Sequence, residues 1–77
     1  MENILHSELI ESDPEKLGGT PVFHGTRVPI QNLFDYLEGG DSLEIFLDDF
    51  PTVSKEQAIG ILELFKIKLL KEYEIAA

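Results

Sequence analysis

The run Gly-Thr-Arg-Val-Pro-Ile at residues 25–30 constrains the fold of this chain more than any other stretch. Gly25 accepts a positive φ, so a tight turn can close there. The next three residues favour an extended strand, because Thr26 and Val28 are β-branched. Pro29 has a fixed φ and no N–H, which suits the first turn of a helix. The run therefore predicts a switch from strand to helix that separates a β-forming head from a helical body.

The chain is short and contains no cysteine among its 77 residues. This length predicts a single domain over 1–77, with a strand and hairpin head at 1–28 and a three-helix body at 29–73. A domain of this size buries only about 60% of the surface of its unfolded chain, so its core is marginal. Because disulfides and thiolate metal sites are excluded, we expect a partner or a second copy to add stability.

Acidic residues dominate the charge, with 15 acids, six bases and a formal net charge of −9. Such a field repels nucleic acids and anionic lipids and attracts basic proteins. A well-hydrated surface explains the same charge without any partner. The N-terminus lacks the basic cluster and apolar run of a secretory signal, and no stretch approaches the roughly 18 apolar residues of a membrane span. We expect a cytoplasmic protein without membrane contact.

The head is expected to contain one short strand and one β-hairpin. The strand lies around residues 9–11, before the turn residues Asp13 and Pro14. The hairpin arms are residues 21–23 and 26–28, on either side of the turn at residues 24 and 25. An isolated hairpin is marginal in water, so this one must dock on the helices or on another chain.

Apolar residues at helical spacing predict a first and a second helix. The first covers residues 29–38 and stops at glycines 39 and 40, because glycine takes the left-handed conformation beyond a helix end. The second begins with Asp41 as its N-cap and has Glu44 three residues later, which is the spacing of a capping box. Pro51 ends it, since the residue before a proline disfavours the α region.

The third helix opens with another capping-box pair, Ser54 and Gln57, and continues to about Tyr73. Three helices joined by short loops predict a mainly α fold, a three-helix bundle with a short N-terminal β-strand and a β-hairpin. The short joint at residues 50–53 is similar to the bend of a helix-turn-helix. Many small helical domains share that spacing.

The third helix has more apolar surface than one bundle needs. One stripe consists of Ala58, Ile61, Leu62, Phe65, Leu69 and Tyr73. A second flank, defined as Ile59, Ile67 and Leu70, lies roughly 100–180° around the helix. We expect the second flank to be the interface of a two-fold homodimer. The alternative is that the first 20 residues fold back over it.

Few residues could carry chemistry, which needs a nucleophile, a base or a metal in a pocket. His6 and His24 are the only histidines, and neither has a partner at metal-ligand spacing. Asp48 and Asp49 are adjacent, so on a helix they point about 100° apart and form a solvated face. We expect no catalytic activity, no metal and no cofactor.

Arg27 is the only arginine and lies in the predicted hairpin. An ion pair with Asp35 or Glu38 would account for it. The alternative is that its planar cation recognises carboxylates on another protein. On that alternative, the candidate partner contacts are Arg27 and the adjacent turn residues His24, Gly25 and Thr26, although His24 beside a glycine is most simply a turn residue.

DNA binding would place the start of the third helix in the major groove. The exposed positions there would then include Lys55, Glu56, Gly60 and Glu63. Two of these four residues are acidic, where bound proteins normally present Lys and Arg to phosphates. We therefore expect Lys55 and Gln57 to face DNA only if a basic partner reverses the charge of the complex.

Three segments together resemble family 433 of the domains of unknown function. Residues 19–30 read Gly-Thr-Pro-Val-Phe-His-Gly-Thr-Arg-Val-Pro-Ile and are similar to its signature G-x-P-x-x-x-G-T-R-[IV]-P-[IV]. Residues 37–45 resemble its segment l-x-x-G-x-S-x-e-e-I, and residues 50–58 resemble the y-P-x-L-t-x-e-x-[VI] opening of its last helix. The resemblance covers residues 8–70.

The resemblance implies both a fold and a function. Members are treated as homeodomain-like helix-turn-helix domains and as antitoxins of the VapB-like type, often associated with a PIN-like ribonuclease toxin. It implies a small antitoxin that neutralises such a toxin and binds operator DNA with it, with motif residues Gly25, Thr26, Arg27, Val28 and Pro29. Two alternatives stay open: a stand-alone helix-turn-helix regulator of transcription, and a structural dimeric interaction module.

Overall fold

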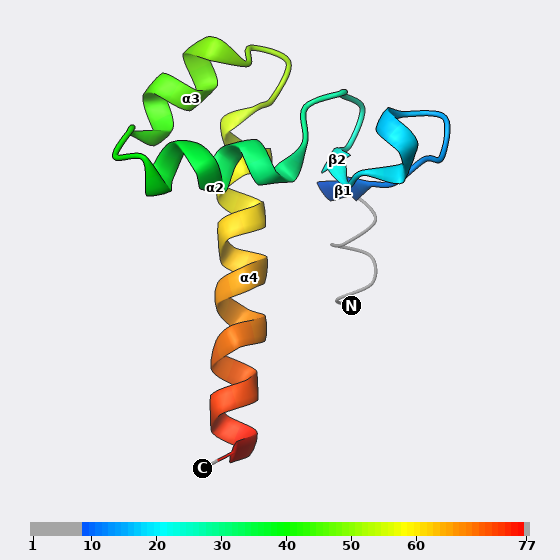
Figure 1. Cartoon of the computed structure of the whole chain (residues 1–77). Coiled ribbons are helices and arrows are strands. Elements are labelled where there is room, and N and C mark those ends of the chain that lie inside the picture. Colours follow the sequence, from blue (N-terminus) through cyan, green and yellow to red (C-terminus); the bar gives the residue numbers. More distant parts are fainter. Residues whose placement is uncertain (1–8, 77) are drawn as a thin grey trace.

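Three helices and one small sheet make up the part of the chain that the structure describes. This structure is a computed structural model, which describes residues 9–76, and side chains as far as residue 72. Its elements are β1 (Ile10–Glu11), the 3-10 turn η1 (Leu17–Gly19), β2 (Val22–Phe23), α2 (Ile30–Glu38), α3 (Leu43–Asp49) and α4 (Lys55–Ala76). In Figure 1, α2 crosses the first turns of α4, and the rest of α4 extends away from the other elements. The prediction of a mainly helical fold with a small β-structure is confirmed.

The sheet differs from the predicted hairpin. β2 pairs antiparallel with β1, with Ile10 opposite Phe23, rather than with residues 26–28. Those residues form no strand. The returning chain is joined to β2 by the bridge between Val22 and Pro29, in which the Phe23 N–H donates to the Val28 carbonyl, and by the Thr26 N–H, which donates to the Phe23 carbonyl. Pro29 takes extended angles (φ −62°, ψ 140°), so it precedes α2 instead of filling the first turn. The switch from extended chain to helix is present. However, the strand that pairs in the sheet is β2, which precedes the turn at Gly25, and not residues 26–28, which follow it.

Glycine ends α2 as predicted, whereas the start of α3 is shifted by one residue. Gly40 has a φ of +94°. The N–H groups of Gly40 and Asp41 donate to carbonyls in the last turn of α2, a pattern that closes a helix end. Ser42, not Asp41, caps α3, because the Ser42 hydroxyl accepts from the N–H of Ile45 at 3.2 Å. Asp41 was the wrong N-cap because its backbone is already used to terminate α2.

The capping box of α4 forms as predicted. The Ser54 N–H donates to Gln57 Oε1, and the Gln57 N–H donates to Ser54 Oγ, both at 3.0 Å. These reciprocal bonds satisfy two backbone donors that a helix start leaves unpaired. They fix the start of α4 directly after the short joint from α3.

The core joins the head to the helices. Phe23 of β2 is fully buried, and its ring centroid lies 5.9 Å from that of Phe46 in α3. Tyr36 of α2 packs edge-on against Phe46, and its hydroxyl donates to an Asp49 carboxylate oxygen at 2.7 Å. That hydrogen bond raises the pKa of Tyr36, because only the neutral phenol can donate it. The buried cluster comprises Phe23, Ile30, Leu33, Phe46, Val53, Ala58 and Ile61.

Candidate functional site

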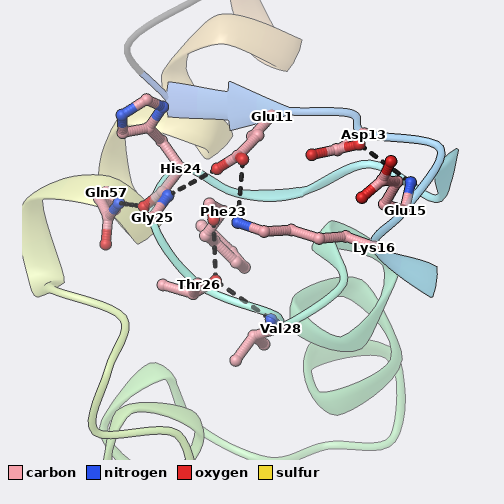
Figure 2. Close-up of polar contacts among 10 residues, drawn as sticks. All are labelled: Glu11, Asp13, Glu15, Lys16, Phe23, His24, Gly25, Thr26, Val28 and Gln57. Carbon is pink, nitrogen blue, oxygen red and sulfur yellow. Dashed lines mark hydrogen bonds and ion pairs between the residues drawn. The ribbon is translucent and has the colours of Figure 1, made fainter.

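Residues 23–28 form a tight turn, here called the signature turn. Glu11 of β1, Thr26 of the turn itself and Gln57 of α4 hold it through hydrogen bonds (Figure 2). Gly25 has a φ of +78°, and its N–H donates to Glu11 Oε1 at 2.9 Å. The other Glu11 oxygen pairs with Lys16 Nζ, also at 2.9 Å. The bond from Gly25 lowers the pKa of Glu11 most, and the bond from Lys16 adds to it, because both donors favour the carboxylate. The turn is thereby tied to β1.

Thr26 holds the same turn from the inside. Its side chain is only 7% exposed. Its hydroxyl donates to the Phe23 carbonyl at 2.8 Å and accepts from the Val28 N–H at 3.1 Å. Both polar capacities of this hydroxyl are therefore used within the chain. We remove Thr26 from the predicted partner contacts, because a partner could not reach it without opening the turn.

Arg27, His24 and Gly25 lie on the outside of the turn and are exposed. Within the described part of the chain Arg27 makes no ion pair, so the predicted pairing with Asp35 or Glu38 is not found. Asp35 instead accepts a hydrogen bond from Gln31 of the same helix at 2.9 Å. The arginine therefore presents its guanidinium to solvent and is available to a carboxylate of another molecule.

The two residues predicted to face DNA have other partners. Gln57 uses its amide oxygen in the capping box and donates through Nε2 to the His24 carbonyl at 2.9 Å. Its amide therefore joins α4 to the signature turn. Lys55 is 59% exposed and lies 3.8 Å from a Glu44 carboxylate, a weak surface pair. Gly60, expected to be exposed, faces Leu9, since a Cβ there would come within 2.9 Å of its side chain.

The second flank of α4 is open to solvent. Ile59, Ile67 and Leu70 are 42%, 44% and 52% exposed. Residues 9–20 do not cover them, and Leu9 packs at Gly60 instead. The half of α4 that extends away in Figure 1 also exposes two members of the first stripe, Phe65 at 43% and Leu69 at 54%. The side chain of Tyr73, the last predicted member of that stripe, lies outside the described residues.

A groove at the junction of the head, α2 and α4 was not anticipated. It has a volume of about 480 Å³, and its apolar walls are Ile10, Pro21, Ile30, Phe34 and Phe65. The rings of Phe34 and Phe65 stack at 5.1 Å with only 7° between their planes. The sequence feature that could have indicated an uncovered surface here is the length of α4. Its 22 residues span about 33 Å, far more than α2 and α3, with nine and seven residues, can cover.

The described residues show neither a cluster of metal ligands nor a membrane-spanning helix. Between residues 9 and 72, no three His, Asp or Glu side chains come together in a group that could hold a metal ion. None of the helices described is both long and apolar enough to cross a bilayer.

Comparisons with known proteins place the chain in a group without an assigned function. The profile described as "Protein of unknown function (DUF433)" matches residues 10–63. The chain is 40% identical over 50 residues to the uncharacterised protein y4eO of Sinorhizobium fredii, a match that spans 65% of this chain and 23% of that protein. It is also similar to the crystal structure of a DUF433 member from Anabaena variabilis, with a TM-score of 0.68 and 21% identity, over 97% of this chain and 75% of that one. At that identity the structural match supports the fold alone.

Proposed function

The chain belongs to the DUF433 family, and on that premise we propose that it is a small protein-binding module of the antitoxin type. In this proposal it self-associates through α4 and neutralises a basic, PIN-like ribonuclease partner, with operator DNA bound only by the complex. The single observation that carries the proposal is the exposure of large apolar side chains on more than one face of α4, where this helix extends away from the other elements. These side chains are Phe65, Ile67, Leu69 and Leu70. Exposed apolar surface of this kind marks an interaction site.

The energetics of the second flank support an interface larger than three residues. Full burial of an aliphatic side chain contributes about 1.5–3 kcal/mol, and these three are already about half buried. Six such side chains in a two-fold dimer therefore contribute roughly 5–9 kcal/mol. Association itself costs about 4–15 kcal/mol, so the second flank alone leaves little surplus. Phe65 and Leu69, which are exposed to a similar degree, supply the additional area.

The distribution of charge supports a basic partner. Residues 9–54 carry nine acids and two bases, which gives a charge of −7, whereas α4 carries four of each. An acidic body attracts a protein with a basic RNA-binding groove and accelerates their encounter. Arg27, which has no ion pair among the described residues, then recognises a carboxylate on that partner.

A titration of ribonuclease activity tests this function. Increasing amounts of the chain are mixed with the PIN-like ribonuclease that the proposal assigns to it, and we expect RNA cleavage to end at a stoichiometric ratio. Arg27→Ala should weaken inhibition by about tenfold. Lys55→Ala is the matched control, because it removes an exposed cation elsewhere, and should inhibit like the wild type. Full cleavage at a saturating excess of the chain would exclude the antitoxin role.

DNA binding by the free chain is the second candidate function. The short joint between α3 and α4 and the exposed Lys55 at the start of α4 favour it. Against it, Glu44 and Glu56 lie beside this lysine in space or sequence, and Gln57 is used internally. Affinity for the upstream DNA, measured at increasing salt, should fall steeply if this candidate is right. Absence of binding by the free chain at low salt would exclude it.

A further inference from the structure

The groove between the head, α2 and α4 is suited to apolar side chains. Five of its lining residues are apolar, and no charged side chain lines it. A polar small molecule would find only hydroxyl and amide groups there, without a charge to orient it. The volume of about 480 Å³ leaves room for several side chains of an incoming segment.

Carboxylates lie next to this groove on α2. Gln31 and Phe34 line the groove, and Asp35 and Glu38 follow them at helical spacing (i, i+3, i+4 and i+7), so all four share one face of the helix. Both carboxylates are exposed, and neither forms an ion pair with another described residue. The groove thus combines apolar walls with a negative edge.

The chain itself carries a segment with the complementary chemistry. Residues 66–71, here called the distal segment, read Lys-Ile-Lys-Leu-Leu-Lys, with three lysines, three aliphatic residues and no acid. All six are exposed. The segment continues α4 directly beyond Phe65, which lines the groove of its own molecule. Because α4 is one continuous helix, its distal segment leads away from its own groove and cannot fold back into it.

We propose that the distal segment docks into the groove of a second copy of this chain, and that the exchange is reciprocal in a two-fold dimer. Ile67 and Leu70, which share the second flank, provide the apolar contacts. Lys66 and Lys68 lie about 100° to either side of Ile67 and reach Asp35 and Glu38 of the other copy. For Lys66 this exchanges an exposed ion pair with Glu63 of its own helix, at 3.0 Å, for one across the dimer. This inference rests on the self-association in the proposed function and deepens it by naming both contact surfaces. It does not depend on the identity of the ribonuclease partner.

Charge distinguishes this occupant from the other candidate within the chain. Residues 1–8 contain Ile4 and Leu5, but they also contain Glu2 and Glu8 and no Lys or Arg. The negative edge formed by Asp35 and Glu38 repels such a segment and attracts the lysines of the distal segment. A groove filled by residues 1–8 would make dimerisation independent of Lys66 and Lys68.

A charge-swap experiment tests the docking. Lys66→Glu/Lys68→Glu places an acidic segment on an acidic edge, and Asp35→Lys/Glu38→Lys places a basic segment on a basic edge, so each variant alone should dimerise about tenfold or more weakly. An equimolar mixture restores opposite charges at both contacts and should form a heterodimer of wild-type strength. Asp41→Lys/Asp48→Lys raises the net charge by the same amount as Asp35→Lys/Glu38→Lys, at positions away from the groove, and is the control for that variant. Masses come from light scattering, with helical content checked by circular dichroism.

The outcomes separate this inference from the proposed function. A wild-type dimer whose strength is unchanged in both variants, or a mixture that stays monomeric, overturns the docking and leaves self-association intact. A monomeric wild type overturns both. Cysteine cross-linking provides a second measurement if a charge variant does not fold, because the chain has no cysteine of its own. Gln31→Cys mixed with Lys68→Cys should form a disulfide faster than Asp48→Cys mixed with Lys68→Cys, and equal rates contradict the proposal.

Discussion

Gln57 tests whether the start of α4 is a structural joint or a DNA-reading surface. Its side chain makes two hydrogen bonds, one to the Ser54 N–H at 3.0 Å and one to the His24 carbonyl at 2.9 Å. Each contributes about 0.5–1.5 kcal/mol net, and values at the lower end apply because both bonds are partly exposed. Alanine regains a few tenths of a kcal/mol in helix propensity. We therefore expect Gln57→Ala to lower the free energy of unfolding by about 0.5–1.5 kcal/mol, and Tm by about 2–12 °C.

Two further variants show how much of this loss comes from the bond to His24 and how much any substitution at the start of α4 would cause. Gln57→Glu keeps the oxygen that accepts from Ser54 but loses the donor to His24, so it should cost less than Gln57→Ala. Lys55→Ala, at the first residue of α4, should change stability by only about 0–0.5 kcal/mol, since the ion pair of Lys55 is long and exposed. Thermal unfolding followed by circular dichroism measures all three. If Gln57→Ala has the same Tm as Lys55→Ala, the Gln57 side chain is not a structural joint between α4 and the signature turn.

Three other perturbations probe the signature turn. Thr26→Val should destabilise the chain by about 1–3 kcal/mol in urea unfolding, because the Val28 N–H loses its acceptor, and Thr26→Ser, which keeps the hydroxyl, should recover most of the loss. Gly25→Ala should cost about 1–2 kcal/mol through its positive φ alone, since nothing lies within 4 Å of the added Cβ; an unchanged midpoint would contradict this. Glu11 has a lowered pKa, so its stabilisation is present above its ordinary value of 4.5 and is lost as pH falls through the lower pKa of the folded state. The stability difference between wild type and Glu11→Gln should therefore be constant near neutral pH and shrink in acid, and a difference that grows in acid would reverse this sign.

Local rules were sufficient for the start of α4 and the end of α2. The Ser54–Gln57 pair predicts a capping box because both partners lie within one turn, and it forms as predicted. The position of Gly40 beyond α2 follows from glycine's access to positive φ. The start of α3 was misplaced by one residue because Asp41 and Ser42 are both good N-caps. Only the three-dimensional course of the preceding turn decides between them.

Contacts distant in sequence could not be predicted in the same way. The pairing of β2 with β1 joins residues more than ten positions apart, and a strand of two residues carries too little pattern to choose its partner. The role of Thr26 was misassigned because a buried threonine and an exposed one look the same in the sequence. Glu11 was missed because its partner, the Gly25 N–H, is a backbone group with no sequence signature.

The second flank was found from helical periodicity, whereas the groove was not. Periodicity places Ile59, Ile67 and Leu70 away from the core, and they are exposed. It also assigns Phe65 and Leu69 to the core stripe, but it does not say where the core stops along the helix. Because α2 and α3 are short, α2 contacts Phe65 on one side only, through Phe34, and both Phe65 and Leu69 stay about half exposed. Whether they contact a second copy stays a prediction.

The most direct test of an interaction module built on α4 is sedimentation equilibrium of the full chain at low micromolar concentration. We expect the wild type to have a mass of twice 8.7 kDa, and Ile67→Ser/Leu70→Ser to have the single-chain mass with helical content retained. Thr52→Ala, at an exposed position in the joint before α4, should sediment like the wild type. A wild-type chain that stays at 8.7 kDa throughout the concentration range would show that α4 does not mediate self-association.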